Sequence, residues 1–222
     1  MIESETRPTS ALKVAGIGCA VVVLAPVLLL LGLVVVYQIE RATPEDYPDV
    51  KPDTMARRIS GYSLDAYAAL GLNRTLNPGG YEAKTNNENS FGSDRCYPDG
   101  LEGMADEPEE GAYRLYHHWM VGRVGKSEGL AALRKVRDHL EATGWRITEY
   151  GKDDQIPEWS VRAKRNGGYG ISVTWEQDFQ RLRGGSGAPC ATDPDWAEAE
   201  EEGLYQGLPD VGPAPPLVPA AS

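Results

Sequence analysis

Few residues of this 222-residue chain have the types and spacing that catalysis or metal binding requires. His117 and His118 are adjacent in a segment of strand-like composition, so their side chains should point to opposite faces of the strand. They could therefore not bind one metal ion together, and the sequence contains one further histidine, His139. The motifs of serine hydrolases, zinc peptidases and dithiol oxidoreductases are absent from the sequence. We expect no cofactor, no metal site and no catalytic residues.

Basic residues in the C-terminal half are the clearest candidates for ligand binding. Segment 112–192 contains 13 Lys and Arg against 9 Asp and Glu, although the whole chain carries a net charge of −11. This local surplus favours an anionic ligand, such as an envelope polymer, a lipid head group or an acidic peptide. A solvated surface without a ligand is the alternative. The candidate anion-binding surface consists of Arg134, Lys135, Arg137, Arg162 and Lys164.

Nucleic acid is not an expected partner, because the chain is acidic and contains no recognised nucleic-acid-binding motif.

The two cysteines of the C-terminal part, Cys96 and Cys190, lie before the first and after the last predicted strand. A lone pair in these positions predicts a disulfide bond formed in an oxidising compartment. By restricting the unfolded chain, a bond that closes a loop of this length stabilises a fold by about 4–5 kcal/mol in the chain-entropy model. Two unrelated buried thiols are the alternative.

The elements that would position these residues follow from the periodicity between 112 and 175. Strands are predicted at 112–124, 145–150, 159–164 and 169–175, and Asn166-Gly167 predicts a hairpin between the last two. A helix is predicted from Ser127 to Gly144, with apolar residues at helical spacing: Leu130, Leu133, Val136 and Leu140.

Each predicted strand carries one tryptophan, which favours a core role over a sugar-stacking platform. The helix should cover the strand face that holds Tyr169, Ile171, Val173 and Trp175. We therefore expect an α+β fold, with a small β-α-β-β-β domain in which one helix packs on a mainly antiparallel sheet. Outside this unit, 54–72 predicts one or two short helices broken near Gly61, 73–111 predicts an irregular loop, and 184–187 predicts a flexible turn.

The apolar run 14–37 contains no charged residue and, at 24 residues, is long enough to cross a bilayer as a helix. Its length and its bulky C-terminal end favour an uncleaved anchor over a signal peptide. The flanking charges do not fix its orientation, so the predicted disulfide places the C-terminal part outside the cytoplasm. The predicted parts are a cytoplasmic N-terminus (1–13), a transmembrane helix (14–37), a proline-rich spacer (38–54), an extracytoplasmic α+β domain (55–192) and a disordered acidic, proline-rich tail (193–222).

This layout resembles that of uncharacterised single-pass cell-envelope proteins of actinobacteria, which have a short N-terminus, one span, a Pro/Asp spacer and a domain with one cysteine pair. The preference for Arg over Lys and the high content of Ala, Gly and Pro add to the resemblance, which implies no particular site residues. The expected protein is integral to the cell membrane. The expected function is a non-catalytic binding or interaction module whose partner is an envelope protein or an anionic envelope component. An envelope hydrolase or its accessory subunit is the alternative.

Overall fold

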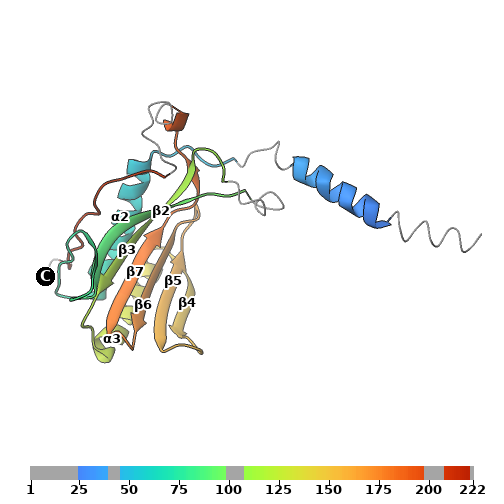
Figure 1. Ribbon diagram of the computed structural model, residues 1–222. Coiled ribbons are helices and arrows are strands. Elements are labelled where there is room, and N and C mark those ends of the chain that lie inside the picture. The colour runs from blue at the N-terminus through green and yellow to red at the C-terminus, as the bar shows by residue number, and fades with distance from the viewer. Residues whose placement is uncertain (1–24, 40–45, 99–107, 198–207, 221–222) are drawn as a thin grey trace, which may run out of the picture. The chain divides into compact units, whose positions relative to one another are not determined.

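The computed structural model describes residues 25–39, 46–98, 108–197 and 208–220, which fall into two compact units. The larger unit, 46–96 and 108–222, has a sheet with two helices on one face (Figure 1). Its elements are, in chain order, α2 (Pro52–Leu70), β1 (Gly79–Glu82), β2 (Asn87–Arg95), β3 (Ala112–Val121), α3 (Lys126–Ala142), β4 (Arg146–Lys152), β5 (Glu158–Lys164), β6 (Gly170–Glu176), β7 (Arg181–Gly187) and β8 (Ala191–Thr192).

The sheet is antiparallel throughout, and its strand order is β1-β2-β3-β7-β6-β5-β4, with β8 paired to β3. It has eight strands in the described part of the chain, where the predicted β-α-β-β-β domain has four. The predicted loop at 73–111 contains β1 and β2, and the predicted turn at 184–187 belongs to β7, which lies between β3 and β6. The predicted fold is therefore wrong in size, because these strands are rich in Gly, Asn and Ser and give little strand signal.

The core lies between the sheet and the two helices. The rings of Tyr67 on α2 and Trp119 on β3 meet edge to face at 5.4 Å. The indole of Trp175 on β6 donates a hydrogen bond to the carbonyl of Val124, 2.9 Å away. The predicted helix-facing side of this strand is confirmed, because Tyr169, Ile171, Val173 and Trp175 all belong to the core. Helix α2 is continuous through Gly61, where a break was expected, because its buried residues hold both halves against the sheet.

The smaller unit, 1–45 and 97–107, is described at 25–39 and at 97–98. Residues 25–39 are helical. Among the described residues, no helix has the length and apolarity needed to cross a membrane. This finding contradicts the predicted transmembrane helix at 14–37, whose first residues, 14–24, lie outside the described residues.

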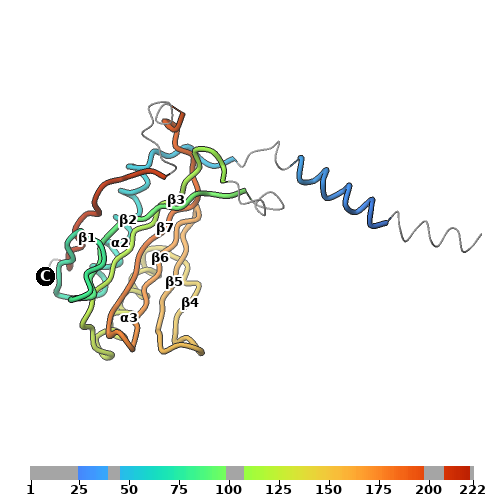
Figure 2. Tube along the Cα trace, viewed as in Figure 1, coloured from blue at the N-terminus to red at the C-terminus, as the bar shows by residue number. Residues whose placement is uncertain are grey.

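Segments that precede and follow the predicted domain pack against it. Val50 donates a backbone hydrogen bond to Thr192, 3.0 Å away. Leu217 is fully buried and exchanges two backbone hydrogen bonds with Leu76, at 2.8 and 2.9 Å. Its segment, 208–220, is the dark red trace of Figure 2. We call residues 208–220 the C-terminal strap. A disordered tail is predicted for 193–222, but the apolar residues of the strap, Leu217 above all, pack into the core.

The disulfide bond between Cys96 and Cys190 is confirmed, with their Cα atoms 6.0 Å apart. Cys96 follows β2 directly, and Cys190 lies between β7 and β8. The bond therefore links two strands that pair with opposite sides of β3.

Candidate functional site: a trough on the open face of the sheet

The sheet face opposite the helices carries side chains in ordered rows. Strand alternation points His117 and Trp119 of β3 into the molecule and His118 to the open face, as predicted for the two adjacent histidines. Registered pairs across β5, β6, β7 and β3 then give three rows on this face: Lys164–Gly170–Gly187–Tyr116, Arg162–Ser172–Gly185–His118, and Ser160–Thr174–Arg183–Met120.

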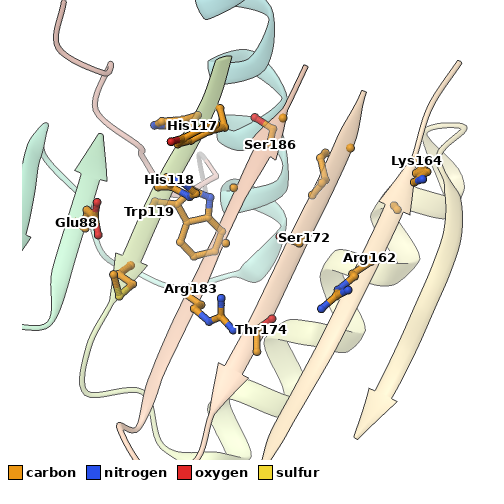
Figure 3. Close-up of a pocket in the computed structure, with 18 of the residues that line it drawn as sticks. Glu88, His117, His118, Trp119, Arg162, Lys164, Ser172, Thr174, Arg183 and Ser186 are labelled. Atoms are coloured by element: carbon orange, nitrogen blue, oxygen red, sulfur yellow. The ribbon is translucent and has the colours of Figure 1, made fainter. Parts of the chain in front are cut away.

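A cavity of about 600 Å³ lies over these rows, and we call it the trough (Figure 3). Strands β6 and β7 form its floor with small residues: Gly170, Ser172, Gly185 and Gly187. Arg162 and Lys164 of β5 line one side, and β3 lines the other. Three strand spacings separate β5 from β3, which corresponds to about 14 Å between their backbones. The trough is therefore a shallow channel about two strands wide.

Two glycines of the floor have no structural need to be glycine. A Cβ atom at Gly187 would meet nothing within 4 Å, and at Gly170 the nearest atom would be the carbonyl oxygen of Ala163, 3.8 Å away. Neither residue has a positive φ. Glycine inside a strand costs about 0.5–1 kcal/mol relative to alanine. Glycine at 170 and 187 thus keeps the trough open and lowers the stability of the strands. Neither packing nor backbone conformation requires glycine at these positions.

Neighbouring glycines differ from this pair because packing requires them. A Cβ at Gly184 would lie 2.3 Å from Cζ2 of Trp119, and a Cβ at Gly185 would lie 2.1 Å from the backbone oxygen of His117. On β2, a Cβ at Gly92 would lie 2.0 Å from the ring of Tyr116.

Carboxylates outside the trough hold two of its cations in place. Arg162 Nε lies 3.4 Å from Glu149 Oε2 on β4. Arg183 donates to Glu158 Oε2 at 3.2 Å and also binds Glu176, a buried residue. These pairs fix the guanidinium groups on either side of Ser172 and Thr174 (Figure 3).

Lys164 forms no salt bridge within the described ranges of the chain. The trough lining therefore combines three permanent cations, Arg162, Lys164 and Arg183, with one carboxylate, Glu88. Glu88 belongs to β2, on the opposite side of the floor from the β5 cations, so the trough has a cationic side and a side with one acid.

The β3 side of the trough is aromatic and uncharged at neutral pH. The ring centres of Tyr116 and His118 lie 4.5 Å apart, and the two ring planes are inclined by 56°. Burial, followed by the charge and hydrogen bonding of Asp94, raises the pKa of Tyr116 above its usual value. Partial burial lowers the pKa of His118, and Arg183 lowers it further while Glu88 opposes the shift. This side therefore presents hydrocarbon ring surface with neutral polar edges.

His117, on the inner face of β3, has a structural role. Its Nε2 atom donates to Asn89 Oδ1 at 2.7 Å, because the Asn89 amide nitrogen donates to the carbonyls of Leu76 and Pro215, at 3.2 and 2.8 Å. Its Nδ1 atom is buried without a hydrogen-bond partner in the described part of the structure. Burial, together with the neighbouring His118, lowers the pKa of His117 to about 4. The neutral ring thus supports the contact between β2 and the C-terminal strap.

The predicted anion-binding residues do not form one surface. Arg162 and Lys164 project from the open face, whereas Arg134, Lys135 and Arg137 belong to α3, which packs on the other face of the sheet (Figure 1). Arg137 hydrogen-bonds Asp138, and its guanidinium carbon lies 4.6 Å from the ring centre of Tyr150.

Sequence reasoning missed Arg183, Tyr116 and the floor glycines. The only signal was the alternation of Arg181, Leu182 and Arg183 before the glycine run, which indicates a strand that continues into the glycines.

The chain matches no family model, no curated protein and no solved structure. Across the described ranges, no three His, Cys, Asp or Glu side chains converge as a metal site would require.

Proposed function

We propose that this protein is a non-catalytic binding module that works in the cell envelope, outside the cytoplasm, and holds an anionic ligand in the trough. The convergence of Arg162, Lys164 and Arg183 around a floor without large side chains is the observation that carries the proposal. The disulfide supports the location, because such bonds persist mainly in oxidising compartments.

The arrangement of charges suits an anion held in a fixed place. Because Glu149 and Glu158 pair with the two guanidinium groups, part of the side-chain entropy of these arginines is lost before a ligand binds. Lys164 would add a cation that is free of carboxylate partners in the described structure. Charge-assisted hydrogen bonds of this kind contribute roughly 1.5–3 kcal/mol each.

The carboxylates around the trough favour binding over catalysis. Glu149, Glu158 and Glu176 all form ion pairs with arginines of the open face, so they act as supports for cations. Glu88, the one carboxylate of the trough lining, lies on the β2 side, away from the β5 cations that would hold the anion.

The test is an NMR titration of the full chain with inorganic phosphate and with polyphosphate at low salt. We expect the backbone amide signals of Gly170, Ser172 and Gly187 to move, because they form the floor. Replacing both β5 cations, Arg162→Gln with Lys164→Gln, should weaken binding at least tenfold.

The matched control replaces two cations of α3, Arg134→Gln with Lys135→Gln, which removes the same charge from the opposite face. This variant should bind as the unaltered protein does. Floor signals that do not respond to any anion, or equal losses in the two double variants, would contradict the proposal.

A further inference from the structure

We infer that the ligand of the trough is an acidic sugar, a uronic acid unit whose ring lies over Gly170 and Gly187, between Lys164 and Tyr116. The inference rests on the proposed function, since it names the class of anion that the trough would hold.

The floor of the trough suits a thin, flat molecule. In the row Lys164–Gly170–Gly187–Tyr116, the two central positions carry no side chain, so the trough extends down to the backbone of β6 and β7. The ends of this row belong to strands about 14 Å apart. The Tyr116 ring lies over Gly92 on β2, so it leaves the floor at Gly187 uncovered. A single sugar ring or an extended chain fits this floor.

The two sides of the trough require different chemistry at the two ends of the ligand. Arg162 and Lys164 on β5 suit a carboxylate, because both donate charge-assisted hydrogen bonds. The opposite side presents the ring of Tyr116 and the neutral imidazole of His118. An aromatic ring binds the C–H face of a sugar through its flat hydrocarbon surface. A uronic acid unit carries both features on one ring.

The floor and the far side supply partners for sugar hydroxyl groups. Ser172 is exposed at the middle of the floor, and Glu88 lies on the β2 side of the trough. A carboxylate accepts hydrogen bonds from hydroxyl groups and repels a second anion. Glu88 pairs with Met120, so it lies in the third row and disfavours a second negative charge at that end of the trough.

The aromatic side is rigid before any ligand arrives. The ring of Tyr116 lies against Gly92, where no side chain intervenes, and its hydroxyl group interacts with Asp94, which is itself paired with Arg114 at 2.9 Å. A ring held on two sides loses little conformational freedom when a ligand stacks on it.

The experiment is calorimetric titration of the full chain with trigalacturonate and with triglucuronate. The matched ligand control is the methyl ester of each trimer, which keeps the ring and removes the charge. We expect at least one free acid to bind and its ester to bind at least tenfold more weakly. Inorganic phosphate and hexaglutamate complete the series, and both should bind at least tenfold more weakly than the preferred trimer.

Two variants test the position of the ring. Gly187→Leu adds a side chain in open space and should reduce binding of the preferred trimer at least tenfold by filling the trough. Gly80→Leu is its control, because Gly80 on β1 also has open space around its Cβ position but lies outside the trough. Tyr116→Leu should weaken trimer binding tenfold and leave the weak phosphate binding unchanged.

The outcomes separate the two proposals. If phosphate or hexaglutamate binds the floor as tightly as the trimers, or if the esters bind as tightly as the acids, the sugar class is wrong. Floor signals that respond to phosphate while both uronate trimers fail to bind also overturn the sugar class, and the proposed function stands. If no anion of the series moves the floor signals, both proposals fail.

Discussion

The adjacent residues His117 and His118 of β3 show that the strand face on which a histidine lies determines what its protonation does. His117 is fully buried and holds Asn89 in place, while His118 lies at the edge of the trough. The pKa values of both are lowered mainly by burial, but the consequences differ. Protonation of His118 adds a charge at the trough. Protonation of His117 places an unpaired charge in the core.

The free energy of unfolding should therefore fall as the pH is lowered from about 6.5 towards 4. In this window the unfolded chain binds a proton at His117 and the folded chain, whose pKa is about 4, does not. The loss attributable to this residue at pH 4.5 is on the order of 2–3 kcal/mol. His117→Gln can still donate to Asn89 but does not titrate, so its stability should depend less on pH.

Urea unfolding of both proteins at pH 7 and pH 4.5 measures this difference. His139→Gln removes a partly exposed histidine paired with Asp65 and serves as the control. An equal loss of stability in the unaltered protein and in His117→Gln would contradict the assignment.

Strand β7 shows how packing against its neighbours determines an element that its own residues scarcely favour. Gly184 leaves room for the indole of Trp119, and Gly185 leaves room for the backbone of β3 at His117. Ser186 fixes the strand to α2, because its hydroxyl donates to the carbonyl of Ile59 at 2.6 Å and meets the hydroxyl of Ser63 at 2.9 Å. A glycine-rich strand is thus held by side chains that belong to other elements.

Alanine at two glycines of β7 should have opposite consequences. Gly184→Ala places a Cβ 2.3 Å from the Trp119 ring and should lower the free energy of unfolding by about 1–3 kcal/mol, because a packed core does not yield easily. Gly187→Ala enters open space and should be neutral or stabilising by up to about 1 kcal/mol. Thermal and urea unfolding of the two variants measure the difference, and equal effects would show that the two positions are packed alike.

The sequence predicted those elements whose own residues carry a clear period. Helix α3 and strands β3 to β6 follow from apolar spacing and from Asn166-Gly167, and Arg162 and Lys164 were chosen from the same pattern. Strands β1, β2 and β7 depend on side chains far away in sequence, such as Trp119 over Gly184 and Tyr116 over Gly92. Local patterns do not contain such contacts. The trough, whose floor is half β7, was therefore beyond prediction.

At the scale of the molecule, one disulfide bond connects the two strands that flank β3, since Cys96 follows β2 and Cys190 follows β7. The disulfide between Cys96 and Cys190 spans a sequence separation of 94 residues, within which lie β3 to β7 and α3. The trough is built on the sheet enclosed by this loop, so the bond stabilises the trough and the fold together.

Removing the bond by Cys96→Ala with Cys190→Ala should lower the free energy of unfolding by about 2–5 kcal/mol, because the unfolded chain regains the freedom of a long loop. Urea unfolding with and without a reductant measures the effect. Reductant should shift the midpoint of the unaltered protein and leave that of the double variant unchanged. Identical midpoints for the oxidised protein and the double variant would show that the bond adds nothing to stability.

The C-terminal strap has a practical consequence for anyone who prepares this domain in the laboratory. Because the strap is rich in proline, it could be mistaken for a dispensable tail and deleted. A chain that stops before Leu217 leaves a cavity in the core and exposes the backbone of Leu76. Such a fragment should expose apolar surface and aggregate during purification. Affinity tags are therefore better added beyond residue 222, with the strap intact.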